Sequence, residues 1–280
     1  MSNLRIIDFN YADDSTLTAS SEAGILVVTN LLTDIKNEIW RSTSRSASIT
    51  SILPVAKSVN AVVLPYTNLT NTATMRVRGY TNSTDIIDTD TPVFDTTATL
   101  CSPYTSASVF GWDNKVPSQP YFSYGGAVYA GLFFTGGTVQ KLYIELNDSA
   151  NSSAYLEVSR LIIGNYWSPT YNADYGLQLG YEDSSANSRN EGGDLMSDIK
   201  PRFKSLTFSL GNFSLSDREK IMKIYRNNGI SKGIYISVFP EDSDKNKEQD
   251  YQIYGKFNSI QALGMPWFDR FSGSFSISEI

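Results

Sequence analysis

The side chains best suited to chemistry in this sequence form two short acidic motifs. Asp88-Thr89-Asp90 and Asp242-Ser243-Asp244 could coordinate calcium through their carboxylate oxygens. Neither motif continues into an EF-hand loop, which needs a glycine and a distant glutamate. A solvated acidic turn is therefore favoured over a calcium site at both positions.

Two pairs of adjacent carboxylates raise the question of glycoside hydrolysis. Asp13 and Asp14 are neighbours, as are Glu182 and Asp183. Hydrolysis needs two acids roughly 5–9 Å apart across a cleft, and adjacency along the chain predicts nothing about such a cleft. A structural role is favoured for both pairs.

The sequence has one cysteine, Cys101, and no histidine. The lack of histidine excludes Ser-His-Asp and Cys-His catalysis and zinc sites that contain histidine. No basic residue lies near Cys101 in the sequence, so we expect a small, partly buried apolar residue rather than a nucleophile. We therefore expect no enzyme, no catalytic residues, no metal site and no cofactor.

Two glycine pairs and one aromatic stretch are further candidates. Gly125-Gly126 and Gly136-Gly137 lack the spacing that cradles phosphate, and they predict turns at the ends of a buried strand over residues 127–134. Residues 110–124 are rich in aromatic side chains, including Trp112. This stretch predicts either contact with a neighbouring subunit or a loop folded over its own core.

The composition favours β structure and argues against nucleic-acid binding. The chain has 280 residues, which predicts two domains, and 41% of them are hydrophobic. Only 19% are charged, so much of the polarity comes from Ser, Thr, Asn and Tyr, which suit sheet faces and turns. The formal net charge of −6 repels phosphate backbones, so we expect no specific nucleic-acid binding.

Neither a signal peptide nor a membrane span is predicted. Residues 1–8 lack the apolar run of a signal peptide. No stretch approaches the ~18 apolar residues of a membrane span. We therefore expect a soluble protein made in the cytosol.

Alternation of apolar and polar residues recurs along the chain and predicts half-buried strands. Many short strands with polar turns favour a mainly β fold built from sandwiches or barrels. The clearest examples are Val59, Ala61 and Val63; Leu142, Ile144 and Leu146; and Leu206, Phe208 and Leu210.

One segment, residues 216–228, predicts an α-helix. Ser216 and Glu219 form a capping box, and Gly229 can take the left-handed conformation that ends a helix. Residues 32–38 predict a shorter helical turn. Residues 181–193 and 241–250 are polar enough to be long loops or arms.

Two stretches resemble the galactose-binding-like, or discoidin-like, family. The first is Asn30-Leu31-Leu32-Thr33-Asp34, followed by Ile39-Trp40-Arg41-Ser42. The second runs from Tyr143 through a polar turn to Leu161-Ile162-Ile163-Gly164. The resemblance implies a jelly-roll β-sandwich over residues 1–165, with Trp40 in its core. The disulfide of secreted members and the sugar-binding set of some lectin relatives are missing, so only the fold is carried over.

The second part of the chain, residues 166–280, resembles tail and baseplate proteins of long-tailed phages, and the resemblance runs from Gly192 to Ile280. The resemblance rests on element order: the strand Phe203 to Leu210, a capped helix, then Ile234 to Pro240, Tyr254 to Phe257 and a terminal strand. It implies a β-domain that carries one α-helix and joins identical subunits into a ring around the tail axis.

Together these observations favour a virion structural protein of a phage tail tip or baseplate, assembled in the host bacterial cytoplasm. Its expected partners are identical subunits and other tail or baseplate proteins. The alternative is a carbohydrate-binding module for host-surface attachment, with host glycans as partners. A polysaccharide-degrading enzyme is disfavoured because no nucleophile site is recognisable.

Overall fold

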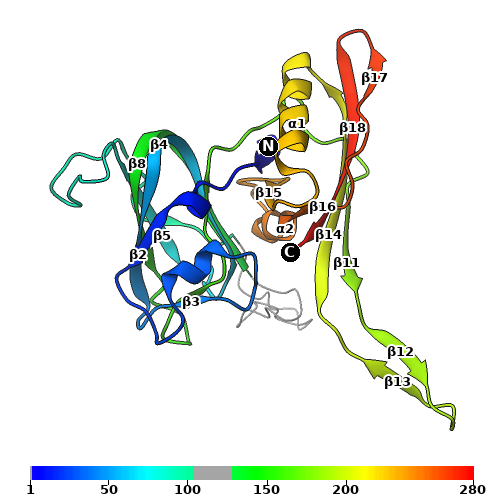
Figure 1. The fold of residues 1–280 in the computed structure, drawn as a ribbon, viewed down its shortest axis with the longest axis horizontal. Helices are drawn as coiled ribbons and strands as arrows, with labels where there is room; N and C mark the ends of the chain where they lie inside the picture. Colours follow the sequence, from blue (N-terminus) through cyan, green and yellow to red (C-terminus); the bar gives the residue numbers. More distant parts are fainter. Residues whose placement is uncertain (1, 104–127) are drawn as a thin grey trace.

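The computed structural model describes residues 2–103 and 128–280, and two β-sheets dominate them. A nine-stranded sheet system forms a sandwich, and a seven-stranded sheet stands beside it (Figure 1). All strand pairs are antiparallel. The mainly β fold predicted from the sequence is therefore confirmed.

The sandwich is organised around two long strands that pair with each other, β4 (Ser46–Thr67) and β8 (Val128–Asn147). The main strand order is β3-β9-β4-β8-β5-β6, with β2 and β10 also on β4 and β7 on β5. The remaining strands are β2 (Thr16–Ala19), β3 (Trp40–Arg41), β5 (Thr74–Tyr80), β6 (Phe94–Asp95), β7 (Thr99–Leu100), β9 (Glu157–Val158) and β10 (Ile162–Gly164), with 3-10 turns η1 (Tyr11–Asp14) and η2 (Val28–Leu32).

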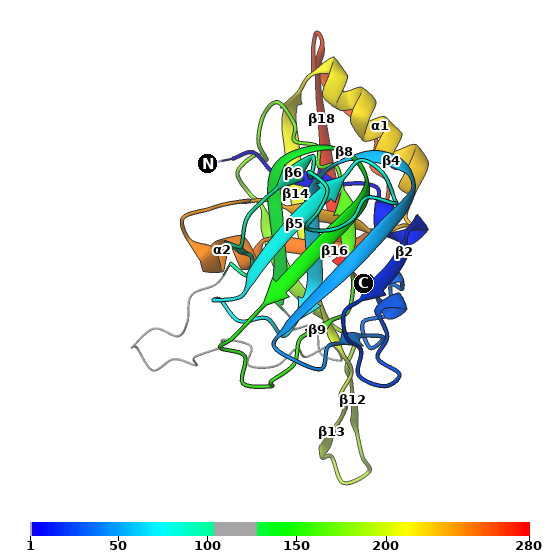
Figure 2. The ribbon, with the colours of Figure 1, turned by 90° about the vertical axis from the view of Figure 1, so that its left-hand side faces the viewer.

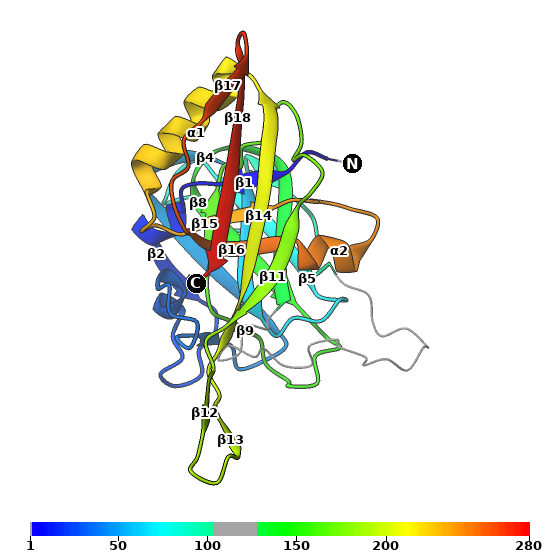
Figure 3. The same ribbon diagram turned by 90° about the vertical axis from the view of Figure 1, so that its right-hand side faces the viewer.

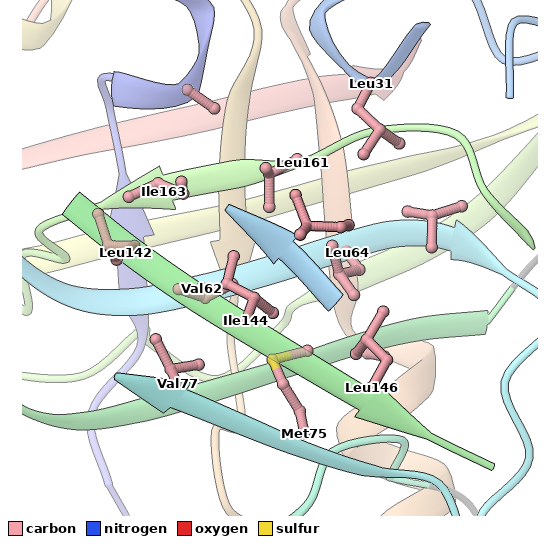
Figure 4. Packing of buried hydrophobic residues seen from close by; sticks show 14 of the residues in the cluster. Leu31, Val62, Leu64, Met75, Val77, Leu142, Ile144, Leu146, Leu161 and Ile163 are labelled. Carbon is pink, nitrogen blue, oxygen red and sulfur yellow. The ribbon is translucent and has the colours of Figure 1, made fainter. Parts of the chain in front are cut away.

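The sandwich core is built from branched aliphatic side chains of these strands. Figure 4 shows Met75 and Val77 of β5 packed beside Ile144 of β8. Trp40 is fully buried in the same core, and its indole N–H donates to the Ser21 carbonyl at 3.1 Å. The predicted core position of Trp40 is therefore confirmed.

The alternation along β4 is interrupted. Val59, Ala61 and Val63 were expected on one face, but Val59 lies in the sandwich core, whereas Ala61 and Val63 lie on the opposite face. The pairing with β8 shifts register between Val59 and Ala61, and such an irregularity turns the following side chains over. The expected common face was wrong for this reason.

The second sheet has the order β1-β15-β16-β18-β14-β11, with β17 also paired to β18. Helix α1 (Leu215–Asn228) packs its buried stripe, Ile221, Ile224 and Tyr225, into the core of this sheet. The strands are β1 (Arg5–Ile7), β11 (Gln178–Asp183), β14 (Arg202–Phe213), β15 (Ile234–Ser237), β16 (Gln252–Phe257), β17 (Gly264–Trp267) and β18 (Arg270–Glu279).

The helices differ from the prediction in their caps and their number. Helix α1 begins at Leu215, and Ser214 with Asp217 forms the capping box, rather than Ser216 with Glu219. A capping box needs an acid three residues after the cap, and Ser214 with Asp217 supplies this spacing two residues earlier in the sequence. Gly229 ends the helix with φ of 54°, as expected.

A second α-helix, α2 (Lys245–Asp250), lies within residues 241–250, which were expected to be a loop. The Asp244 carboxylate accepts hydrogen bonds from the N–H groups of Asn246 and Lys247, which stabilises this short helix from its N-terminus. The helical turn expected over residues 32–38 lies earlier, at η2. The long loop expected over 181–193 is largely strand, in β11 and in β12 (Ala186–Arg189), which pairs with β13 (Leu195–Asp198).

A third buried cluster joins the sandwich to the second sheet. It contains Ala61 and Val63 of β4, with Tyr235 of β15 and Tyr254 of β16. Strand β1, although it lies at the start of the chain, pairs with β15 of the second sheet. The division into units 1–165 and 166–280 stays a prediction, and the structure adds that the first strand sits with the second unit.

Candidate functional site

The two acidic motifs serve local structure. Asp242 pairs with Lys247 at 3.1 Å, and Asp244 caps α2. Asp88 forms an ion pair with Arg78, and the Asp90 carboxylate accepts from the Ile86 N–H. No three His, Cys, Asp or Glu side chains within 2–103 and 128–280 are arranged to hold a metal ion. The turn interpretation therefore accounts for these motifs.

The two pairs of adjacent carboxylates differ in setting: Asp13 and Asp14 both line one hollow of about 300 Å³, whereas Glu182 and Asp183 lie on an exposed strand. Asp13 pairs with Arg160 at 2.7 Å. Glu182 and Asp183 follow each other in β11, so their side chains point to opposite faces of the strand. Asp183 pairs with Arg202 at 2.8 Å. Asp13 and Asp183 thus each have a structural partner.

Cys101 is 1% exposed, and its thiol lies 3.5 Å from the Ala73 carbonyl oxygen. Burial raises the pKa of this thiol to about 12, so the reactive thiolate is strongly disfavoured. The structural interpretation of Cys101 accounts for this position.

Only one of the two glycine pairs lies within the described residues. Gly136 and Gly137 lie inside β8 and not at a turn, so that expectation was wrong. A Cβ at Gly136 would stand 1.7 Å from the Val59 carbonyl oxygen, so the close approach of β4 and β8 requires glycine there. Gly125-Gly126 and the aromatic stretch with Trp112 lie outside the described residues.

The first site that the sequence did not reveal is an exposed apolar hairpin end, which we call the tip and define as residues 264–270. Met265, Trp267 and Phe268 are 55%, 72% and 88% exposed. The tip lies at one end of the long strands of the second sheet (Figures 2 and 3). The only sequence signal was a short apolar run, Met265-Pro266-Trp267-Phe268, without a period that predicts burial.

A second projection, which we call the arm, extends from the opposite end of the same sheet (Figures 1 and 3). It consists of β12 and β13, and every residue of both strands is exposed. Leu195 and Met196 are each 58% exposed, and Ile199 at its base is 69% exposed. The arm is a two-stranded hairpin whose side chains have no core of their own.

A third site lies where the sandwich meets the second sheet, and we call it the seam hollow. It has a volume of about 440 Å³. An adjoining hollow of about 280 Å³ shares Phe133, Phe134 and Thr135 with it. The lining of the seam hollow includes Arg5, Asn60, Phe133, Thr135, Tyr166 and Glu241.

A polar network also crosses the junction between the two sheets. The Arg160 side chain is 4% exposed and pairs with Asp13 at 2.7 Å and with Asp34 at 3.2 Å. Its Nε donates to the Tyr254 hydroxyl at 3.2 Å, and that hydroxyl donates to Asp34 at 2.7 Å. Because Tyr254 belongs to β16, this network ties the sandwich to the second sheet.

Comparisons with known proteins found no matching family model and no curated protein that matches the sequence. Several solved structures are similar in fold to the sandwich. A chitosan-binding module from Paenibacillus sp. IK-5 is 15% identical, with a TM-score of 0.39, and the match covers 56% of this chain and 99% of that one.

Two further neighbours are carbohydrate-binding modules as well. One, from Clostridium perfringens in complex with GalNAc-β-1,3-galactose, is 10% identical with a TM-score of 0.38, covering 56% of this chain and all of that chain (100%). The other, a fucose-binding module from Streptococcus pneumoniae, is 13% identical with a TM-score of 0.36, covering 56% and 94%. Likeness at this level concerns the fold and assigns no ligand to this chain, and none of these three is a tail or baseplate protein.

Proposed function

We propose that this chain is a non-catalytic structural subunit that assembles with copies of itself, as part of a phage tail tip or baseplate. The observation that carries the proposal is the pair of projections, the tip and the arm, which place large apolar side chains in solvent at opposite ends of one sheet. The tail setting itself is supported by the sequence resemblance of residues 192–280.

Exposed apolar projections of this kind need a surface that covers them. Monomeric proteins rarely leave contiguous apolar side chains exposed, and a patch of this kind marks a contact surface. A lone two-stranded hairpin is at best marginally stable in water, so the arm gains most of its order from a surface that covers it. Projections at opposite ends suit head-to-tail contacts between identical subunits, which close into rings when the rotation allows.

The test is self-association of the purified chain, measured by sedimentation across a wide concentration range and by electron microscopy. The double variant Trp267→Ala/Phe268→Ala removes the two most exposed rings of the tip. Burial of each ring contributes about 1.5–3 kcal/mol. The double variant should therefore raise the dissociation constant about a hundredfold or more, since about 1.4 kcal/mol is tenfold.

The matched control is Ile25→Ala, because Ile25 is 88% exposed but lies on the sandwich, away from the tip. This control should assemble as the wild type does, and all three proteins should melt at similar temperatures. A wild-type chain that stays monomeric at every concentration contradicts the proposal, as does a tip variant that assembles normally.

A second candidate function is glycan binding, and the seam hollow is the observation that favours it. Aromatic rings lie there beside hydrogen-bonding groups, which is the combination that sugar rings and their hydroxyls need. The solved neighbours also include modules whose names record chitosan, fucose and GalNAc-β-1,3-galactose as ligands. A glycan array with the purified chain tests this function independently of assembly.

A further inference from the structure

We propose that the seam hollow binds a neutral saccharide, with Arg5, Asn60 and Thr135 as hydrogen-bonding groups and Tyr166 and Phe133 as apolar walls. This inference rests on the second candidate function, glycan binding, and names its site. The site combines residues of the sandwich with residues of the second sheet, so the isolated sandwich would lack it.

The first support is the irregular pairing of β4 and β8 at this place. Residues 134–136 of β8 stand opposite the single residue Asn60 of β4, because Ala61 pairs with Phe133 and Val59 pairs with Gly137. Gly136 is the residue that permits the two backbones to approach here. Bulges of this kind re-aim side chains and are frequent beside functional sites. Here the bulge places Thr135 at the surface of both hollows.

The second support is the incomplete hydrogen bonding of the buried Arg5 side chain. Its guanidinium lies 4.4 Å from the centre of the Phe133 ring and 4.7 Å from that of Tyr166, and one nitrogen pairs with Glu241 at 2.8 Å. The side chain is 10% exposed, yet its Nη1 has no hydrogen-bond partner among the described residues. A buried donor without a partner is costly, and a ligand hydroxyl or an ordered water would relieve that cost.

Two further groups in the hollow have hydrogen-bonding capacity left. The Asn60 side-chain oxygen accepts from the Tyr166 N–H at 2.8 Å, while its amide nitrogen makes no hydrogen bond within the described residues. The Thr135 hydroxyl is likewise without a partner there and is exposed. Hydrogen-bonding groups beside aromatic rings suit a sugar, because its hydroxyls can bond to the former while its C–H face packs on the latter.

The charge and size of the hollow define the class of saccharide. Arg5 and Glu241 form an ion pair within the hollow, so their charges cancel and a neutral sugar is favoured over an acidic one. A volume of about 440 Å³ falls within the range of small-ligand sites. The adjoining hollow of about 280 Å³ leaves room for a second ring, which favours an oligosaccharide over a single sugar.

The test is calorimetric titration of the full chain with lactose, cellobiose and chitobiose, and with glucuronic acid as the acidic comparison. Thr135→Val removes one hydroxyl at constant shape and should weaken binding roughly three- to tenfold. Arg5→Lys keeps the charge but loses the planar donor fork, and should weaken binding about tenfold or more. Thr138→Val is the matched control, because Thr138 is exposed on the same strand but lies outside both hollows.

The possible results test the seam hollow and glycan binding separately. Binding of a neutral disaccharide that weakens in Thr135→Val and Arg5→Lys but not in Thr138→Val supports the inference. Binding that all three variants retain overturns the site and leaves glycan binding in place. No binding of any disaccharide, together with a silent glycan array, overturns both. Tighter binding of glucuronic acid than of the neutral sugars refutes the neutral class.

Discussion

The network around Arg160 yields a quantitative prediction, because one buried guanidinium serves both sheets. The substitution Arg160→Met keeps most of the side-chain volume but removes every hydrogen bond of the guanidinium. The lost contacts are the ion pairs with Asp13 and Asp34, the bond to the Tyr254 hydroxyl and the bond at 3.2 Å to the Leu31 carbonyl.

The magnitude follows from burial on the two sides of the pair. Removal of one partner from a fully buried ion pair costs about 3–5 kcal/mol, since the other charge stays buried and unpaired. Here the side chains of Asp13 and Asp34 are 44% and 35% exposed, so water screens them once Arg160 is gone. We therefore expect a loss of about 2–3 kcal/mol in the free energy of unfolding, at or below the lower limit of that range.

The assay is thermal unfolding of the full chain beside a control that removes a surface ion pair. Arg76 suits the control because its side chain is 38% exposed and it pairs with Asp95 at 2.6 Å. The loss in Arg160→Met should lower the melting temperature by about 5–10 °C, whereas Arg76→Met should cost no more than about 1 kcal/mol. Equal melting temperatures for the two variants would refute the reasoning.

The pH dependence gives a second readout of the same network. Burial raises the pKa of Asp13 above its ordinary value, while Arg160 acts to lower it. Loss of Arg160 raises this pKa further, and an acid whose pKa is raised by folding favours the folded state only when protonated. The stability deficit of Arg160→Met should therefore be largest at neutral pH and should shrink as the pH falls through the pKa of Asp13.

Three further predictions concern single residues. Cys101, with its pKa raised to about 12, should resist alkylation at pH 8 in the folded chain and react quickly in denaturant, as mass spectrometry would record; fast labelling of the folded chain would refute its burial. Trp40→Ala should cost about 3–5 kcal/mol of stability, while Trp267→Ala should leave the melting temperature unchanged, and a reversed order would contradict the assigned exposures. Ser214→Ala should cost about 1 kcal/mol, since it removes the cap of α1; Ser216→Ala should cost less, and denaturant unfolding that ranks them the other way would return the cap to Ser216.

The sequence predicted the elements whose signals are local. Alternation over residues 206–210 predicted β14, and the apolar spacing of Ile221, Ile224 and Tyr225 predicted the buried stripe of α1. The core position of Trp40 came from a resemblance and is confirmed. The alternation in β14 and the apolar spacing in α1 depend only on residues that are close together in the sequence.

The features that the sequence did not predict depend on distant pairing. The bulge opposite Asn60 exists only because β4 meets β8 some seventy residues later, so no period within either strand records it. The exposure of Trp267 is equally invisible, because an aromatic residue in a short apolar run is usually buried. The seam hollow combines Arg5 with Tyr166 and Glu241, and only the folded chain brings these three together.

The placement of β1 determines how the sandwich is attached to the second sheet. Ile6 and Trp167 exchange two backbone hydrogen bonds, each 2.8 Å long, so the chain leaves the second sheet and returns to it at adjacent points. The segment between these two points, residues 7–166, contains the whole sandwich, and the pairing of Ile6 with Trp167 holds its two ends together. Replacing this segment would keep the pairing of Ile6 with Trp167 but would leave Tyr235 and Tyr254 without the sandwich residues that bury them, so any substitute must supply a matching apolar face.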